Sequence, residues 1–149
     1  MSEISFRVHG RPAPQGSKRG FVRGARAVVV DVNHDALMSW RSVVADAARQ
    51  VYDAQRDGLI DVGLEVDMTF YFTRPKGHFG AGRNRAQLKA HAPLEHIVKP
   101  DNDKLERAVF DALTGVVWRD DCLVHTCTTR KRYGLPGVDV CITYHESQE

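Results

Sequence analysis

Four aspartates in the second half of the chain form two close pairs. Asp101 and Asp103 flank a single residue, and Asp120 and Asp121 are adjacent. Carboxylate oxygens are hard ligands that suit Mg²⁺ or Mn²⁺. Such an ion polarises a phosphoryl oxygen and lowers the pKa of an attacking water. If the chain returns the second pair to the first, a third carboxylate from Asp121 would make an open metal site with room for a phosphate.

Each pair also has an ordinary structural explanation. An aspartate at a helix start usually caps the helix and favours the positive end of its dipole. Adjacent aspartates before an apolar strand usually form a solvated turn. The chemical interpretation is favoured because both pairs occur on one unit, a helix followed by a short return.

The segment between the pairs has the pattern of an amphipathic helix. Pro100 disfavours a helical conformation before it, and Asp101 or Asn102 can then cap a helix. Gly115 is a natural stop. The apolar residues that follow helical spacing are Leu105, Ala108, Val109, Ala112 and Leu113.

Three charged residues recur every four positions on the opposite face of this helix. Asp103, Arg107 and Asp111 therefore share one exposed stripe of acid, base and acid. After Gly115, a short turn suffices to bring Asp120 or Asp121 back towards the helix start. Consecutive side chains on an extended chain point to opposite faces, so at most one of these two is expected to face the metal.

This region closely resembles the RusA family of Holliday junction resolvases. The resemblance is carried by residues 99–105, 110–114 and 118–121, and it is strongest over 96–124. It extends more weakly to residues 12–19, which look like the amino-terminal segment of phage-type members. The resemblance implies a RusA-like fold and a Mg²⁺-dependent, structure-selective endodeoxyribonuclease, with Mn²⁺ as a substitute ion.

Carried over residue by residue, the resemblance implies that Asp101, Asp103 and Asp121 are the catalytic metal ligands. The family often has Asn directly after the second Asp and Lys three residues further on, where this chain has Lys104 and Arg107. Arg107 keeps the positive charge but not the point-like, titratable ammonium of lysine. Arg107, or Lys104, is expected to counter the developing phosphate charge.

The resemblance also implies the partners. The substrate is branched DNA, above all a four-way junction, whose paired strands are cut. A homodimer with two active sites fits the two-fold symmetry of such a substrate.

Two basic regions are candidates for contact with that DNA. Residues 11–20 are predicted to be a loop and 21–30 a hairpin, while 74–94 form a long basic connection, flexible over 75–94. Solvated connections without a role are the alternative, and 83–90 could form a short helix. The expected DNA contacts are Lys18, Arg19, Arg23, Arg83, Arg85, Lys99 and Lys104.

Hydrophobic periodicity predicts the rest of the fold. Strands are expected near 4–8, 64–72, 123–128 and 138–144, and a helix over 37–55 in which Trp40 is a core anchor. We therefore expect one RusA-like domain over 1–149, of the α/β (α+β-like) class, with a mixed sheet of about five strands and two main helices.

Composition bounds the remaining possibilities. The 149 residues carry a formal net charge of +2, which is not the strongly cationic composition of a non-specific nucleic-acid coat. No apolar run is long enough for a membrane span and no signal peptide is recognisable. Three cysteines without metal-site spacing indicate reduced thiols in a cytoplasmic protein.

From the residues alone, the roles of His96 and Asp120 stay open, and so do two other functions of the whole protein. His96 is a ligand, a phosphate contact or a strand residue with one satisfied hydrogen bond, and Asp120 is an outer ligand or merely holds its turn. The whole protein could instead be a non-catalytic junction-binding module, or a metal-stabilised structural domain that binds no nucleic acid. No phosphate-binding glycine loop or nucleophile elbow is present, so the carboxylates are the chemical centre.

Overall fold

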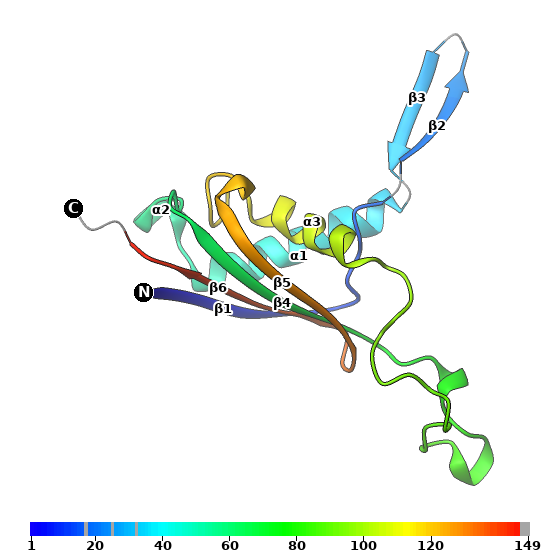
Figure 1. Ribbon diagram of the computed structural model, residues 1–149. Helices are drawn as coiled ribbons and strands as arrows, with labels where there is room; N and C mark the ends of the chain where they lie inside the picture. Colours follow the sequence, from blue (N-terminus) through cyan, green and yellow to red (C-terminus); the bar gives the residue numbers. More distant parts are fainter. Residues whose placement is uncertain (17, 25, 32, 147–149) are drawn as a thin grey trace.

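The computed structural model describes residues 1–16, 18–24, 26–31 and 33–146, with the side chains of 18–23 and 26–31 outside that description. The mixed sheet and its helices are arranged as Figure 1 shows. The elements in chain order are β1 (Ser2–His9), β2 (Lys18–Arg23), β3 (Arg26–Asp31), α1 (His34–Val51), α2 (Ala54–Asp57), β4 (Leu64–Phe72), α3 (Asn102–Leu113), β5 (Val124–Tyr133) and β6 (Gly137–Tyr144).

The main sheet has four strands in the order β1-β6-β4-β5. β4 pairs parallel with β5 and antiparallel with β6, and β1 pairs antiparallel with β6. The fold class and the mixed sheet are as predicted. The main sheet has four strands, however, where a single sheet of about five was expected. β2 and β3 form a separate antiparallel hairpin that projects from the body, because their strands pair with each other rather than with the main sheet (Figure 1).

Both long helices pack on one face of the sheet (Figure 1). The predicted apolar stripe of α3 is buried in full: Leu105, Ala108, Val109, Ala112 and Leu113. Trp40 of α1 is only 4% exposed, so its prediction as a core anchor is confirmed. β4 is the interior strand predicted from its alternation, and Met68 and Phe70 on it are fully buried. This core fixes α3 against the sheet and leaves its charged stripe outside.

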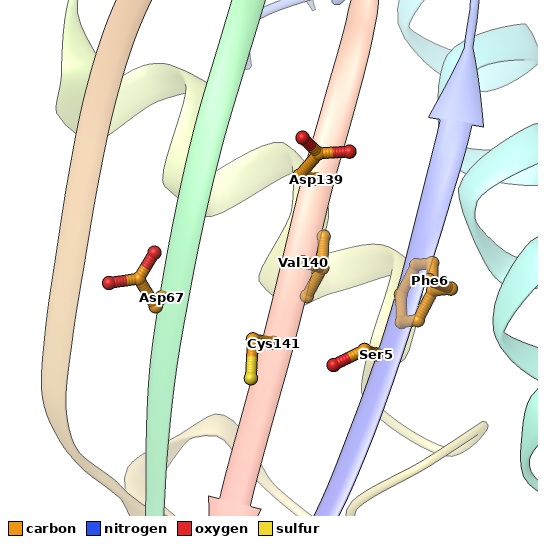
Figure 2. Close-up of a pocket in the computed structure, with 6 residues that line it drawn as sticks. All are labelled: Ser5, Phe6, Asp67, Asp139, Val140 and Cys141. Carbon is orange, nitrogen blue, oxygen red and sulfur yellow. The ribbon is translucent and has the colours of Figure 1, made fainter.

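The other face of the sheet is polar, and Figure 2 looks onto it with helix behind the strands. Asp139 forms an ion pair with Arg7 at 2.9 Å, and Asp67 forms one with Arg130 at 2.9 Å. Since both acids are already paired with arginines, the shallow hollow on this face is not a candidate metal centre. The hollow is lined by Ser5, Phe6, Asp67, Asp139, Val140 and Cys141.

The long basic connection after β4 folds into turns. Short 3₁₀ helices occupy Lys76–His78 and Gly82–Asn84, and the amide of Gly80 donates to the carbonyl of Gln87 at 2.9 Å. The short helix considered for 83–90 is wrong, because this hydrogen bond turns the chain back on itself there. Within the described part of the chain, no helix combines the length and the apolar composition that crossing a membrane requires.

Candidate active site

Asp101 and Asp103 lie at the first turn of α3, at the positive end of its dipole. Asp101 occupies the N-cap position with extended backbone, yet its side chain makes no capping hydrogen bond. Both residues are exposed. Among the residues that the structure describes, no hydrogen bond or ion pair engages either carboxylate. The capping explanation therefore accounts for the position of Asp101 but not for its carboxylate, which is left open for a ligand.

Asp120 holds a turn, one of the two roles left open for it. Its Oδ1 accepts a hydrogen bond of 3.0 Å from the amide of Cys122, at the start of the 3₁₀ helix Asp121–Leu123. This backbone hydrogen bond is the main reason that the pKa of the Asp120 carboxyl lies below its usual value. Asp120 has the extended backbone expected of it, but Asp121 begins the 3₁₀ turn, so strand alternation does not separate their side chains.

Asp121 turns towards the charged stripe of α3. Partial burial raises the pKa of its carboxyl above the usual value, and the nearby carboxylates of Asp120 and Asp111 raise it further, while Arg107 opposes them. The chain therefore returns to α3 as predicted. After the turn around Gly115, Asp121 lies within electrostatic reach of Arg107 and Asp111, whereas the prediction placed it near the helix start.

The charged stripe consequently has two acidic ends. Four residues span about 6 Å along a helix, so Arg107 lies about 6 Å from both Asp103 and Asp111 along the axis. Asp101 and Asp103 form one end, and Asp111 and Asp121 form the other. Sequence reasoning placed Asp111 on this face but did not include it in the site.

The donor chemistry of these carboxylates suits a hard divalent cation, since all are oxygen ligands and Asp101, Asp103 and Asp121 are exposed. Across residues 1–16, 18–24, 26–31 and 33–146, however, no three or more acidic, histidine or cysteine side chains are grouped so as to hold a metal ion. Asp101, Asp103 and Asp121 thus do not converge on one point in this arrangement. Like charges repel one another, and a bound cation would offset that repulsion.

Strand β5 fixes the start of α3 through polar contacts that sequence reasoning missed. The hydroxyl of Thr129 donates to Glu106 at 2.8 Å, and the side-chain amide of Asn102 donates to the carbonyl of Thr129 at 3.3 Å. The ammonium of Lys131 donates to the carbonyls of Val98 and Pro100 at 2.6 and 2.8 Å. The sequence signal was the unbroken polar run from Thr128 to Arg132 on this strand.

The amino-terminal segment reaches the same helix start. The amide of Gln15 donates to the carbonyl of Lys104 at 3.0 Å. This hydrogen bond joins two of the stretches that resemble the RusA family, 12–19 and 99–105. Because β2 follows directly, the projecting hairpin begins beside the first turn of α3.

His96 is buried, with 7% of its surface exposed, and its ring stacks on Phe72 with centroids 4.3 Å apart. Burial, and then the positive charge of Lys131, hold the pKa of His96 below its usual value. Its Nδ1 has no partner within the described chain. The strand assignment that we considered for His96 is wrong, because the residue follows an isolated bridge at Glu95 and lies outside any strand.

The expected DNA contacts lie on three segments around the start of α3. Arg83 and Arg85 are exposed on the basic connection, Lys99 is exposed before Asp101, and Lys104 is partly buried in the first helical turn. The side chains of Lys18, Arg19 and Arg23 lie outside the described residues, although their backbone forms β2. Figure 1 shows that the hairpin and the basic connection both project from the end of the body at which α3 begins.

Comparisons with known proteins match the sequence over most of the chain. YqaN of Bacillus subtilis strain 168, described as an uncharacterized protein, is 27% identical over 143 residues, which cover 95% of this chain and 96% of YqaN. The family model for endodeoxyribonuclease RusA matches residues 10–143, and so includes the hairpin, the basic connection, α3 and β5. The chain belongs to the RusA family of endodeoxyribonucleases.

Proposed function

We propose that this protein is a Mg²⁺-dependent endodeoxyribonuclease that resolves four-way DNA junctions by hydrolysing backbone phosphodiesters, with Mn²⁺ able to replace Mg²⁺. The observation that carries the proposal is the stripe of α3. Asp101 and Asp103 lie exposed at its start, and the side chain of Asp101 makes no capping hydrogen bond. Asp121 lies within electrostatic reach of Arg107 further along the helix. Membership of an endodeoxyribonuclease family supports hydrolysis as the use of this stripe.

Asp101, Asp103 and Asp121 are the proposed metal ligands. A divalent ion, when bound, supplies a polarised phosphoryl oxygen and a more acidic water. Asp121 must be ionised to act as a ligand, and the charge of Arg107 favours that ionised form. Asp120 supports the site indirectly, since it holds the 3₁₀ turn that presents Asp121.

Arg107 is the proposed partner of the scissile phosphate. It is exposed and lies between the two acidic ends of the stripe. A guanidinium at that position can pair with phosphate oxygens and counter the charge that develops on them. Lys104, in the first turn of the same helix, is the second candidate for this role.

The two projecting segments are proposed to hold the DNA. A two-stranded ribbon such as β2–β3 has the width that a major groove admits. The basic residues at 18, 19, 23, 83, 85, 99 and 104 would neutralise phosphates and set the orientation of the junction without reading its sequence. We propose that residues 75–94 adapt to the DNA on binding, and that a homodimer in the cytoplasm cuts paired strands.

A non-catalytic junction-binding module is the second candidate. It is favoured by one observation, the absence of a ready three-ligand group among the described residues. A structural domain that binds no nucleic acid is the third possibility raised by the sequence.

One experiment separates these functions. The protein is incubated with a synthetic four-way junction, and with a linear duplex of the same sequence, first with Mg²⁺ and then with EDTA. We expect symmetric nicks in the junction with Mg²⁺ alone and little cutting of the duplex. Binding without cutting in Mg²⁺ or Mn²⁺ identifies a junction-binding module, and absence of binding at low salt identifies a structural domain. Equal cutting of junction and duplex contradicts structure selectivity.

A further inference from the structure

Asp101 lies between two backbone positions that are both held by β5. On one side, Lys131 donates from its ammonium to the carbonyl of Pro100 at 2.8 Å. On the other, the side chain of Asn102 donates to the carbonyl of Thr129 at 3.3 Å. Thr129 and Lys131 are two residues apart on β5, so one short stretch of this strand holds both groups. It therefore fixes the chain immediately before and immediately after a proposed ligand.

The segment before Asp101 has few other attachments. Ile97 and Val98 are 71% and 59% exposed, so their burial contributes little to holding it in place. Residues 96–101 form neither helix nor strand. The ammonium of Lys131 donates to the carbonyl of Val98 at 2.6 Å as well as to that of Pro100. It thereby holds the backbone on both sides of Lys99, directly before Asp101. Hydrogen bonds from a charged donor are stronger than those from a neutral one.

His96 provides the other anchor of this segment. Its ring is buried against Phe72 and lies 5.2 Å from the ring of Tyr133, centroid to centroid. A buried ring sets where the segment sits but leaves the later residues free to rotate about the backbone. The two hydrogen bonds from Lys131 remove that freedom where Asp101 begins the helix.

We infer that Lys131 is a positioning residue, which aligns the carboxylate of Asp101 with that of Asp103 by holding the carbonyls of Val98 and Pro100. The inference rests on the proposed function, since it assigns Asp101 and Asp103 to metal binding. It predicts that loss of Lys131 weakens metal binding more than DNA binding. Residues that orient metal ligands typically change metal affinity about 10- to 100-fold when replaced.

The test is direct binding of Mn²⁺ alone to the purified protein, measured by calorimetry or electron paramagnetic resonance. Lys131→Met removes the donor but keeps an unbranched apolar stem. We expect its Mn²⁺ affinity to fall about tenfold or more. Lys131→Arg restores a charged donor and should recover most of the affinity. The matched control is Arg132→Met, which removes one positive charge from the next residue on the opposite strand face and should leave Mn²⁺ affinity unchanged.

Two further readouts separate positioning from general effects. Junction binding in EDTA, where no metal contributes, should weaken no more in Lys131→Met than in Arg132→Met. The Mg²⁺ concentration that half-saturates cleavage should rise in Lys131→Met, while the rate at saturating Mg²⁺ is largely recovered. If Lys131→Met does not fold, as judged by thermal unfolding, Lys131→Leu, which also lacks a donor, is measured in its place.

Several outcomes would overturn the inference. Unchanged Mn²⁺ affinity in a folded Lys131→Met protein does so, and so does an equal loss of affinity in Arg132→Met. If wild-type protein binds Mn²⁺ but never cuts a junction, the proposed function is overturned. The Mn²⁺ affinities of the variants then still decide whether Lys131 has the positioning role. Wild-type protein that binds no Mn²⁺ overturns both.

Discussion

Asp121, on the turn before β5, lies within electrostatic reach of Arg107 in the middle of α3, and Arg107 lowers the pKa of the Asp121 carboxyl. Burial and the carboxylates of Asp120 and Asp111 act in the opposite direction. Arg107 therefore has two effects in the proposed site. It offers a positive charge to a phosphate, and it keeps Asp121 ionised at lower pH.

Replacement of Arg107 tests both effects. Arg107→Gln should lower the single-turnover cleavage rate about 10²-fold, the loss typical of removing one preorganised donor. It should also move the acidic limb of the pH–rate profile to higher pH, because the pKa of Asp121 rises without the guanidinium. Arg107→Lys keeps a positive charge and should retain cleavage within about tenfold.

If the acidic limb of the pH–rate profile of Arg107→Gln stays at the pH of the parent protein, Asp121 and Arg107 are not coupled. The control is Arg49→Gln, which removes an exposed arginine whose partner is Asp46 on α1. That variant should cleave as the parent protein does.

Asp120→Asn and Asp121→Asn should have opposite effects on stability. The pKa of Asp120 is lowered in the folded protein, so its contribution to stability is present above the unfolded pKa and is lost as pH falls through the folded value. The pKa of Asp121 is raised, so stability is lost as pH rises through its folded value. At neutral pH, Asp120→Asn should therefore lower the melting temperature, and Asp121→Asn should leave it unchanged or raise it.

Cleavage should reverse this order. Asp121→Asn removes a proposed ligand and should eliminate cutting, whereas Asp120→Asn, which keeps a side-chain oxygen able to accept from Cys122, should reduce it modestly. Both variants should still bind junction DNA, since removing a negative charge near phosphate does not weaken attraction. A dead Asp120→Asn protein beside an active Asp121→Asn protein would assign the wrong carboxylate to the site.

The parts of this fold that sequence predicts are those with a local cause. Leu105, Val109 and Ala112 recur at helical spacing because a single face of one helix is buried, and that periodicity is visible without knowing what covers it. The alternation of β4 is equally local. The four-residue recurrence of Asp103 and Arg107 likewise placed them on one stripe before any tertiary contact was known.

What sequence could not predict depends on contacts between distant segments. The hairpin was expected, but nothing in its residues tells that it pairs with itself alone and leaves the main sheet with four strands. Asp121 meets the second half of α3 because of the length of the turn around Gly115, which periodicity does not encode. No sequence pattern marks the role of Lys131, since its two acceptors are backbone carbonyls and leave no trace in side-chain types.

Asp101→Asn and Asp103→Asn should each abolish cleavage without disturbing the fold. An amide keeps the shape of the side chain but removes the charge that holds a hard cation. Neither carboxylate has a hydrogen-bonding partner among the described residues, and both are exposed, so thermal unfolding should change little. Asp46→Asn, an exposed aspartate on α1, is the control. Cleavage near the parental rate by either variant would exclude that residue as a ligand.

The basic segments should make junction binding strongly dependent on salt. Each phosphate contact contributes a log–log slope of about −0.9 with salt concentration. Arg83→Gln combined with Arg85→Gln removes two exposed charges from the connection after β4, and should weaken junction binding and make the slope shallower by about 2. Mn²⁺ affinity should stay unchanged, because neither residue belongs to the proposed metal site. Fluorescence anisotropy with a labelled junction in EDTA measures affinity and slope together, and Arg49→Gln is again the control. An unaltered slope in the double variant would mean that this connection does not contact the phosphates, and would leave the hairpin as the segment to test next.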